Sequence, residues 1–142
     1  MFVSDRAHGP THPGSALSLK LAALCFVLFA VAVLLNGATQ SAAGWLAARQ
    51  IVRAGFRVVA AGAVAWGLFR GARWAWVLGL VLGSFWLVAG LLTVIVLERN
   101  DLEWLRPSGF QVFLFASLAS LGLAIALLLS PSARQAVRRP RV

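Results

Sequence analysis

The stretch WAWVLGLVLGSFWLVAGLLTVIVL, from Trp74 to Leu97, decides the fold class of this protein, because its 24 residues contain no charged side chain. At about 1.5 Å per residue, an α-helix of this length is about 36 Å long. That length exceeds the ~30 Å hydrocarbon core of a bilayer. A helix also pairs its own backbone polar groups, as lipid requires. The stretch therefore predicts a transmembrane helix.

Apolar runs on either side of this stretch predict further spans. The run Leu17–Leu35 ends at Asn36-Gly37, a pair that favours the end of a helix. The last run follows Pro107-Ser108 and stops before Pro131. We predict an all-α membrane protein, an up-down bundle of four transmembrane helices. The predicted spans are 17–36, 51–70, 74–97 and 109–130, between a flexible polar tail (1–16) and a basic tail (131–142).

The second span is the shortest of the four. Its uninterrupted apolar run, Val58–Phe69, has 12 residues, about 18 Å of helix. To cross the bilayer, the helix has to begin near Ile51, so that Arg53 and Arg57 become part of it.

The composition supports this class. The chain is 61% hydrophobic and 12% charged, whereas soluble domains carry about 25% charged residues. The net charge of +9 comes from cations beside apolar runs, where they orient the protein and contact anionic lipid headgroups, so we expect no nucleic-acid partner. Twelve arginines against one lysine (Lys20), with abundant Ala and Gly, suggest a GC-rich bacterial genome and hence the bacterial plasma membrane.

Basic residues also predict the orientation. Four spans place both termini on one side, together with eight of the 13 Lys and Arg residues. The positive-inside rule then places both termini in the cytoplasm. Four tryptophans fall at predicted interfaces, where we expect them to anchor the bundle: Trp45, Trp74, Trp76 and Trp104.

The first span has a second interpretation. A basic tail, an apolar run and the residues SAAG (Ser41–Gly44) also suit a signal peptide cleaved after Ala43. The run is longer than the roughly 7–15 residues of a signal-peptide core. We therefore favour a retained helix.

The sequence ARQIVRAGFR (Ala48–Arg57) places Arg49, Arg53 and Arg57 four residues apart, on one face of the second span. Three hypotheses fit this face. The arginines anchor to headgroups; they pair with acidic residues of the next loop on that side; or they bind an anion or anionic lipid, as planar guanidinium groups do well. Arg57 lies about 10 Å inside the span and needs a partner. The predicted partners are Glu98 and Asp101.

Gly79, Gly83 and Gly90 lie within about 40° of one another on the third span and form a smooth stripe. Such stripes allow helices to approach closely. We favour packing within the bundle, and a homodimer contact remains the alternative.

Groups that carry chemistry are scarce. No Asp, Glu or His lies inside the predicted spans, which argues against proton-coupled transport and haem ligation. Cys25 is the only cysteine, and His8 and His12 flank a segment unsuited to a helix, so we predict no metal site. Ser84, Ser117 and Ser120 have no His or carboxylate nearby on their own helices. We predict no catalytic residues, no cofactor and no enzymatic activity.

One segment carries a resemblance. In WGLFRGARWAW (Trp66–Trp76), a Gly-Leu-x-x-Gly-x-Arg-Trp-Ala pattern is formed by Gly67, Leu68, Gly71, Arg73, Trp74 and Ala75. It resembles a turn between spans two and three in uncharacterised small bacterial four-helix integral membrane proteins. The resemblance covers about a tenth of the chain. It implies the same topology and no particular activity.

Two functional hypotheses follow. The first, motivated by the glycine stripe, is a non-enzymatic structural or accessory protein that packs with itself or with a larger membrane complex. The alternative is a small transporter or channel for an anionic or apolar solute, with Arg49, Arg53 and Arg57 lining the route.

Overall fold

The computed structural model describes residues 14–42, 48–99 and 110–138, and these residues contain no β-strand. The helices are α1 (Gly14–Ala42), α2 (Ala48–Phe69), α3 (Arg73–Arg99), α4 (Phe110–Leu129) and the short α5 (Pro131–Arg138). The first four are long and apolar enough to cross a membrane. The prediction of an all-α protein with four candidate transmembrane helices is confirmed.

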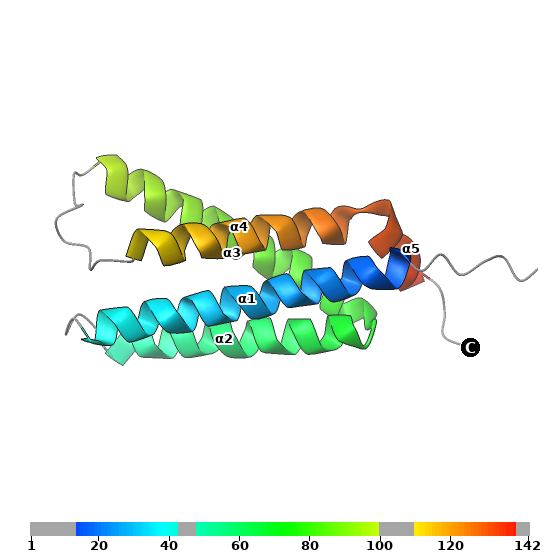
Figure 1. The fold of residues 1–142 in the computed structure, drawn as a ribbon, viewed down its shortest axis with the longest axis horizontal. Coiled ribbons are helices and arrows are strands. Elements are labelled where there is room, and N and C mark those ends of the chain that lie inside the picture. Colours follow the sequence, from blue (N-terminus) through cyan, green and yellow to red (C-terminus); the bar gives the residue numbers. More distant parts are fainter. Residues whose placement is uncertain (1–13, 43–47, 100–109, 139–142) are drawn as a thin grey trace, which may run out of the picture.

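Helix α1 lies at the centre of the arrangement. It packs against α2 on one side and against α4 and α5 on the other (Figure 1). Helix α3 contacts α2 and α4 and crosses the others at an angle (Figure 1). The α2–α3 turn and α5 lie at the same end of the molecule, together with the beginning of α1 (Figure 1). This end is called the hairpin end below.

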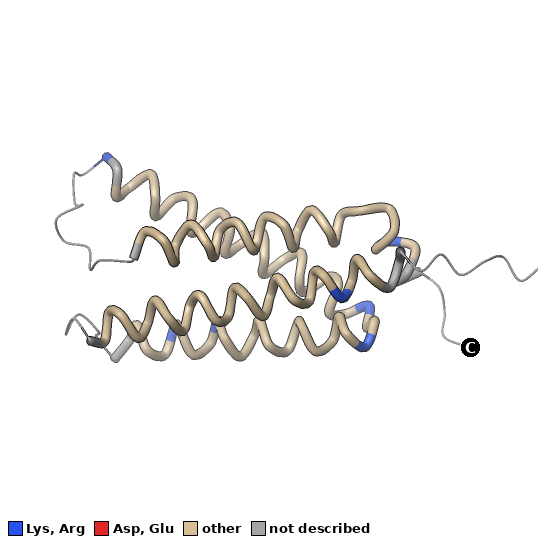
Figure 2. Tube along the Cα trace, in the orientation of Figure 1, with Lys and Arg blue, Asp and Glu red and all other residues tan. Residues whose placement is uncertain are grey.

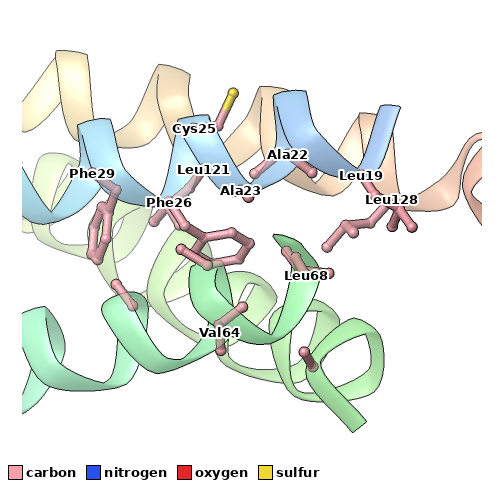
Figure 3. Close-up of a cluster of buried hydrophobic side chains, with 14 of the residues drawn as sticks. Leu19, Ala22, Ala23, Cys25, Phe26, Phe29, Val64, Leu68, Leu121 and Leu128 are labelled. Carbon is pink, nitrogen blue, oxygen red and sulfur yellow. The ribbon is translucent and has the colours of Figure 1, made fainter. Parts of the chain in front are cut away.

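Among the side chains that the structure describes, the buried ones lie in the half of the bundle at the hairpin end. The buried hydrophobic residues extend no further than Ala32 on α1 and Trp86 on α3. They begin only at Ala61 on α2 and Leu121 on α4. We call this region the packed half, and we call the remainder of the four long helices the open half. Figure 3 shows the packed half, where the Phe26 ring points from α1 into the space between the helices.

The contacts of the packed half depend on small residues. The core includes a set of alanines that are buried to within a few per cent: Ala22, Ala23, Ala61, Ala65, Ala75, Ala124 and Ala133. Small side chains let helix backbones approach closely, which matters in lipid, where apolar burial alone gives little driving force between helices. Phe26, which is fully buried, fills the space that remains.

The α2–α3 turn has the hydrogen bonds of a Schellman motif. The Ala72 amide donates to the Gly67 carbonyl, and the Gly71 amide donates to the Leu68 carbonyl, both at 2.9 Å. Gly71 has a φ of 66°, in the left-handed region that favours glycine. Gly67 is equally constrained, because a Cβ there would collide with the Ala75 side chain.

The junction of α4 and α5 is set by Pro131, which has no amide hydrogen for the Leu127 carbonyl. Ser130 replaces that donor, since its hydroxyl donates to the Leu127 carbonyl at 2.6 Å. The same hydroxyl oxygen accepts from the Ala133 amide at 3.3 Å and so caps α5. The basic tail predicted from residue 131 therefore begins as a helix.

The predicted end of the first helix at Asn36-Gly37 is wrong, because α1 continues to Ala42. Neighbouring polar groups stabilise this extension. The Thr39 hydroxyl donates to the Asn36 carbonyl at 2.9 Å. The Gln40 side-chain amide donates to Asn36 Oδ1 at 3.3 Å. The Asn36–Gln40 pair is spaced by four residues, as side-chain pairs that stabilise a helix are, and it offsets part of the weak helix propensity of Asn and Gly. The Thr39 bond satisfies its hydroxyl locally.

Candidate functional site

A cleft of about 270 Å³ lies mainly in the open half and reaches the edge of the packed half at Phe29, Trp86 and Leu121. All four long helices line it. On α1 it runs from Gln40, next to the end of the apolar span at Ser41, to Phe29. Twelve residues separate Phe29 from Ser41, which corresponds to about 18 Å along the helix. The cleft therefore extends from one end of the spans to about the middle of the bundle.

Polar side chains line the outer part of the cleft, beside Phe113 and Leu114 of α4. Asn36 and Gln40 come from α1, Gln50 from α2 and Thr93 from α3. The Thr93 hydroxyl donates to the Ala89 carbonyl of its own helix at 2.8 Å. Such local bonds satisfy a hydroxyl within an apolar helix. The side-chain amides of the mouth offer both donors and acceptors to a solute.

One wall of the cleft is cationic. Arg53 and Arg57 of α2 both line it, one helical turn apart. Figure 2 shows cations along the first half of α2. All four Asp and Glu side chains of the chain lie outside the part that the structure describes. Like charges four residues apart destabilise a helix slightly. The wall thus carries two positive charges one helical turn apart.

The inner end of the cleft is aromatic. The Phe29 ring of α1 stacks on the Trp86 ring of α3, with centroids 5.2 Å apart and an interplanar angle of 18°. Both side chains are buried, at 4% and 6% exposure. Leu118 and Leu121 of α4 complete this inner end, which we call the aromatic floor. Aromatic pairs of this kind contribute about 0.5–1.5 kcal/mol beyond the area that they bury.

The structure brings together only part of the predicted arginine face. Arg53 and Arg57 share the cleft, whereas the side chains of Arg49 and Glu98 and the whole of Asp101 lie outside the described residues. Among described residues, Arg53 and Arg57 make no hydrogen bond or ion pair. Pairing of Arg57 with Glu98 or Asp101 stays a prediction.

The glycine stripe faces the other helices of the same chain. A Cβ on Gly79 would lie 3.2 Å from side-chain atoms of both Leu128 and Val64. A Cβ on Gly90 would lie 2.6 Å from Leu118 Cδ2. Gly83 is 3.4 Å from Ile125 by the same measure. This side of α3 is therefore already occupied within the bundle.

The predicted tryptophan anchors have different environments. Trp74 is half exposed, and Trp76 donates from its indole Nε1 to the Leu128 carbonyl at 3.0 Å. Trp45 and Trp104 lie outside the described residues. The sequence analysis missed Trp66, whose ring lies 4.7 Å below the Arg70 guanidinium carbon in a cation–π contact.

Most residues of the cleft also escaped the sequence analysis. The signal that was present is the spacing of Phe29, Asn36 and Gln40, which places them on one face of α1. The predicted helix end at Asn36-Gly37 places Gln40 outside the first span, so the sequence analysis does not predict this face. Nothing in the sequence distinguishes Trp86 from any other aromatic residue in an apolar run.

Comparison with known proteins gives no further guide: no family model, no curated protein and no solved structure matches this chain. The resemblance of the Gly67–Ala75 turn to small bacterial four-helix membrane proteins stays an expectation. The cleft is the feature of this molecule that bears on function.

Proposed function

We propose that the chain is a multi-pass protein of the bacterial plasma membrane, with four spans in alternating directions and both termini in the cytoplasm. Four long apolar helices and the distribution of basic residues support this arrangement. In this orientation the hairpin end is cytoplasmic. The mouth of the cleft then faces the opposite side of the membrane.

Within that frame, we propose that the protein binds a small anionic solute in the cleft, without catalysing a reaction, and moves it into or across the membrane. The observation that carries this proposal is the pair Arg53 and Arg57, which line the same cleft one helical turn apart. Guanidinium groups hold carboxylates and phosphates at two points each. The pair therefore supplies several directed donors to one anion.

Depth distinguishes this proposal from simple headgroup anchoring. Arg57 lies seven residues inside the span that begins at Gln50, about 10 Å along the helix. A charge at the centre of a membrane costs at least about 2.5–3.5 kcal/mol, with less expected nearer the edge. A cleft that admits water and an anion removes much of that cost, whereas contact with lipid tails does not.

The glycine stripe no longer favours the packing hypothesis, in which an accessory protein associates with itself or with a complex. The glycines that suggested it contact Leu118, Ile125 and Leu128 of the same chain. It stays a prediction that native electrophoresis in mild detergent tests. A defined oligomer, or a protein partner that co-purifies, would support it.

Flux into proteoliposomes tests the solute proposal. The wild-type protein is expected to carry at least one member of a panel of small anions that includes acetate, benzoate and phosphate. Arg57→Gln should lower that flux at least fivefold, because it removes one of the two charges of the cleft.

Arg134→Gln is the matched control, since it makes the same change on α5 at the hairpin end, outside the cleft. It is expected to leave the flux within twofold of wild type. Equal flux through empty and protein-containing vesicles for every anion would refute the transport proposal. A loss of flux in both variants would show that net charge, rather than the cleft, matters.

A further inference from the structure

Building on the proposed anion site, we infer that the solute is a single-chain amphiphilic oxyanion. Its carboxylate or phosphate head lies against Arg53 and Arg57, and its short apolar chain lies on the aromatic floor, formed by Phe29, Trp86, Leu118 and Leu121. The inference rests on the order of chemical groups along the cleft.

The lining of the cleft changes with depth. Measured along each helix from the end of its span, Gln40 and Gln50 lie within about 2 Å and Arg57 at about 10 Å. Trp86 and Phe29 follow at about 16 and 18 Å by the same measure. Amides, both arginines and the apolar Phe113 and Leu114 share the outer part of the cleft, down to about 10 Å, where Leu118 lies level with Arg57, and every lining residue beyond that depth is apolar. A solute that enters from the mouth therefore meets the amides and cations together, and last a wholly apolar surface.

An inorganic anion would contact only some of the groups that line the cleft. Phosphate or chloride would be held at the arginines and would leave the floor in contact with water. Ligand sites are characteristically apolar with a few well-placed polar groups that fix orientation. The floor has that apolar character, and the two arginines are the orienting groups. A ligand with one charged end and one apolar end matches both.

The size of the cleft selects among amphiphiles. Its volume of about 270 Å³ is slightly below the range of roughly 300–1,000 Å³ typical of ligand pockets. Liquid water occupies about 30 Å³ per molecule, so the cleft corresponds to about nine waters. A carboxylate or phosphate with one short chain fits this space. The two long acyl chains of a phospholipid do not.

Trp86 supplies a readout at the floor, because its ring is stacked on Phe29 and lines the cleft. A chain that reaches the floor replaces water beside this indole. We therefore expect a change in tryptophan emission with chain-bearing ligands and none with acetate.

The experiment uses the full-length protein in nanodiscs of zwitterionic lipid, with empty nanodiscs to subtract partitioning. Octanoate, octyl phosphate, 1-octanol and acetate are titrated by calorimetry and by tryptophan emission. Octanoate and octyl phosphate are expected to bind saturably, at least tenfold more tightly than octanol, which lacks the charge, and than acetate, which lacks the chain. A carboxylate source and a phosphate source are thus compared on the same chain.

Two variants locate the head and the chain. Arg57→Gln should weaken octanoate binding at least tenfold, and Arg134→Gln should leave it within twofold of wild type. Leu118→Phe narrows the floor and should weaken octanoate while acetate binding stays unchanged. Thermal unfolding of each variant shows whether it is folded. If Arg57→Gln does not fold, Arg53→Gln replaces it with the same expected loss.

The outcomes separate this inference from the proposed function. Acetate that binds as tightly as octanoate, with both dependent on Arg57, would overturn the amphiphile inference and leave the anion site standing. Octanoate binding that is unaffected by Arg53→Gln and Arg57→Gln would refute both. Competitive displacement of octanoate by phosphatidylglycerol in the nanodisc would identify a lipid headgroup as the occupant and overturn the single-chain ligand.

Discussion

The two halves of the bundle are built from the same four helices and differ in almost every other respect. In the packed half, alanines bring the helices together and Phe26 fills the centre. In the open half, no described hydrophobic side chain beyond Ala32 on α1 is buried, and α2 carries two arginines. Stability is thus concentrated at the hairpin end, and the candidate site lies at the other end.

The difference shows how one short sequence forms both a tightly packed region and a cleft. Packing in lipid needs small residues at helix contacts, and α2 supplies Ala61 and Ala65 in its second half. Its first half supplies Arg53 and Arg57 instead, which line the cleft. Binding regions are commonly drawn from the less stable parts of a protein. The open half is that part here.

Truncating one phenylalanine in each half should give the largest contrast. Phe26→Ala removes a fully buried ring and is expected to lower the free energy of unfolding by about 2–3 kcal/mol. Soluble cores lose about 3–5 kcal/mol for such a change, but part of that value reflects water, which lipid replaces here. Phe113→Ala, on the wall of the cleft, should cost less than about 1 kcal/mol.

Unfolding in mixed micelles of mild and denaturing detergent measures both values. The comparison fails if the two substitutions cost the same, because the open half would then be as tightly packed as the other. Tighter binding of octanoate by Phe113→Ala than by the wild-type protein would support the contrast between the halves, since a larger cleft should admit the chain more easily.

The fold class was predictable because one requirement decides it: in lipid, the backbone polar groups have to pair with one another. A charge-free run such as Trp74–Leu97 has no alternative to a helix in lipid, and three similar runs surround it. Helix ends were less predictable, because local partners override propensity. Asn36 and Gly37 favour a stop, yet the hydrogen bonds of Thr39 and Gln40 extend α1 by a further turn and a half.

The site was predictable only in part. Arg53 and Arg57 stand out because charges are rare in apolar helices and have to be accounted for individually. The aromatic floor did not stand out, since Phe29 and Trp86 meet across two helices, and their contact depends on a crossing angle that the sequence does not specify. A charge is recognisable within one helix, whereas a cleft is a property of four.

Enlarging a glycine tests whether the packed half is as tight as its contacts indicate. Gly79→Leu places a side chain where even a Cβ lies 3.2 Å from Val64 and Leu128. Overpacking of this kind costs about 1–3 kcal/mol, and we expect about 2 kcal/mol.

Gly122→Leu on α4 is the matched control, because a Cβ there has nothing within 4 Å. It should be neutral or stabilising by up to about 1 kcal/mol, as Leu is the better helix former. Equal destabilisation by the two leucines in the same unfolding assay would show that the glycine stripe has no special role in packing.

The smallest expected effect comes from removing single hydrogen bonds, one between two helices and one within a helix. The Trp76 indole joins α3 to the last turn of α4 at the Leu128 carbonyl, so Trp76→Phe removes a bond between helices. Bonds of this type contribute about 0.6 kcal/mol on average in membrane proteins, and we expect a loss of that size. In the open half, the Thr93 hydroxyl bonds only to the Ala89 carbonyl of its own helix. That carbonyl keeps its helical partner when the hydroxyl is removed, so Thr93→Val should change the free energy of unfolding by less than about 0.3 kcal/mol. If Thr93→Val is instead the more costly of the two, its hydroxyl has a role in the open half beyond local satisfaction, and the stabilising bonds are not confined to the hairpin end.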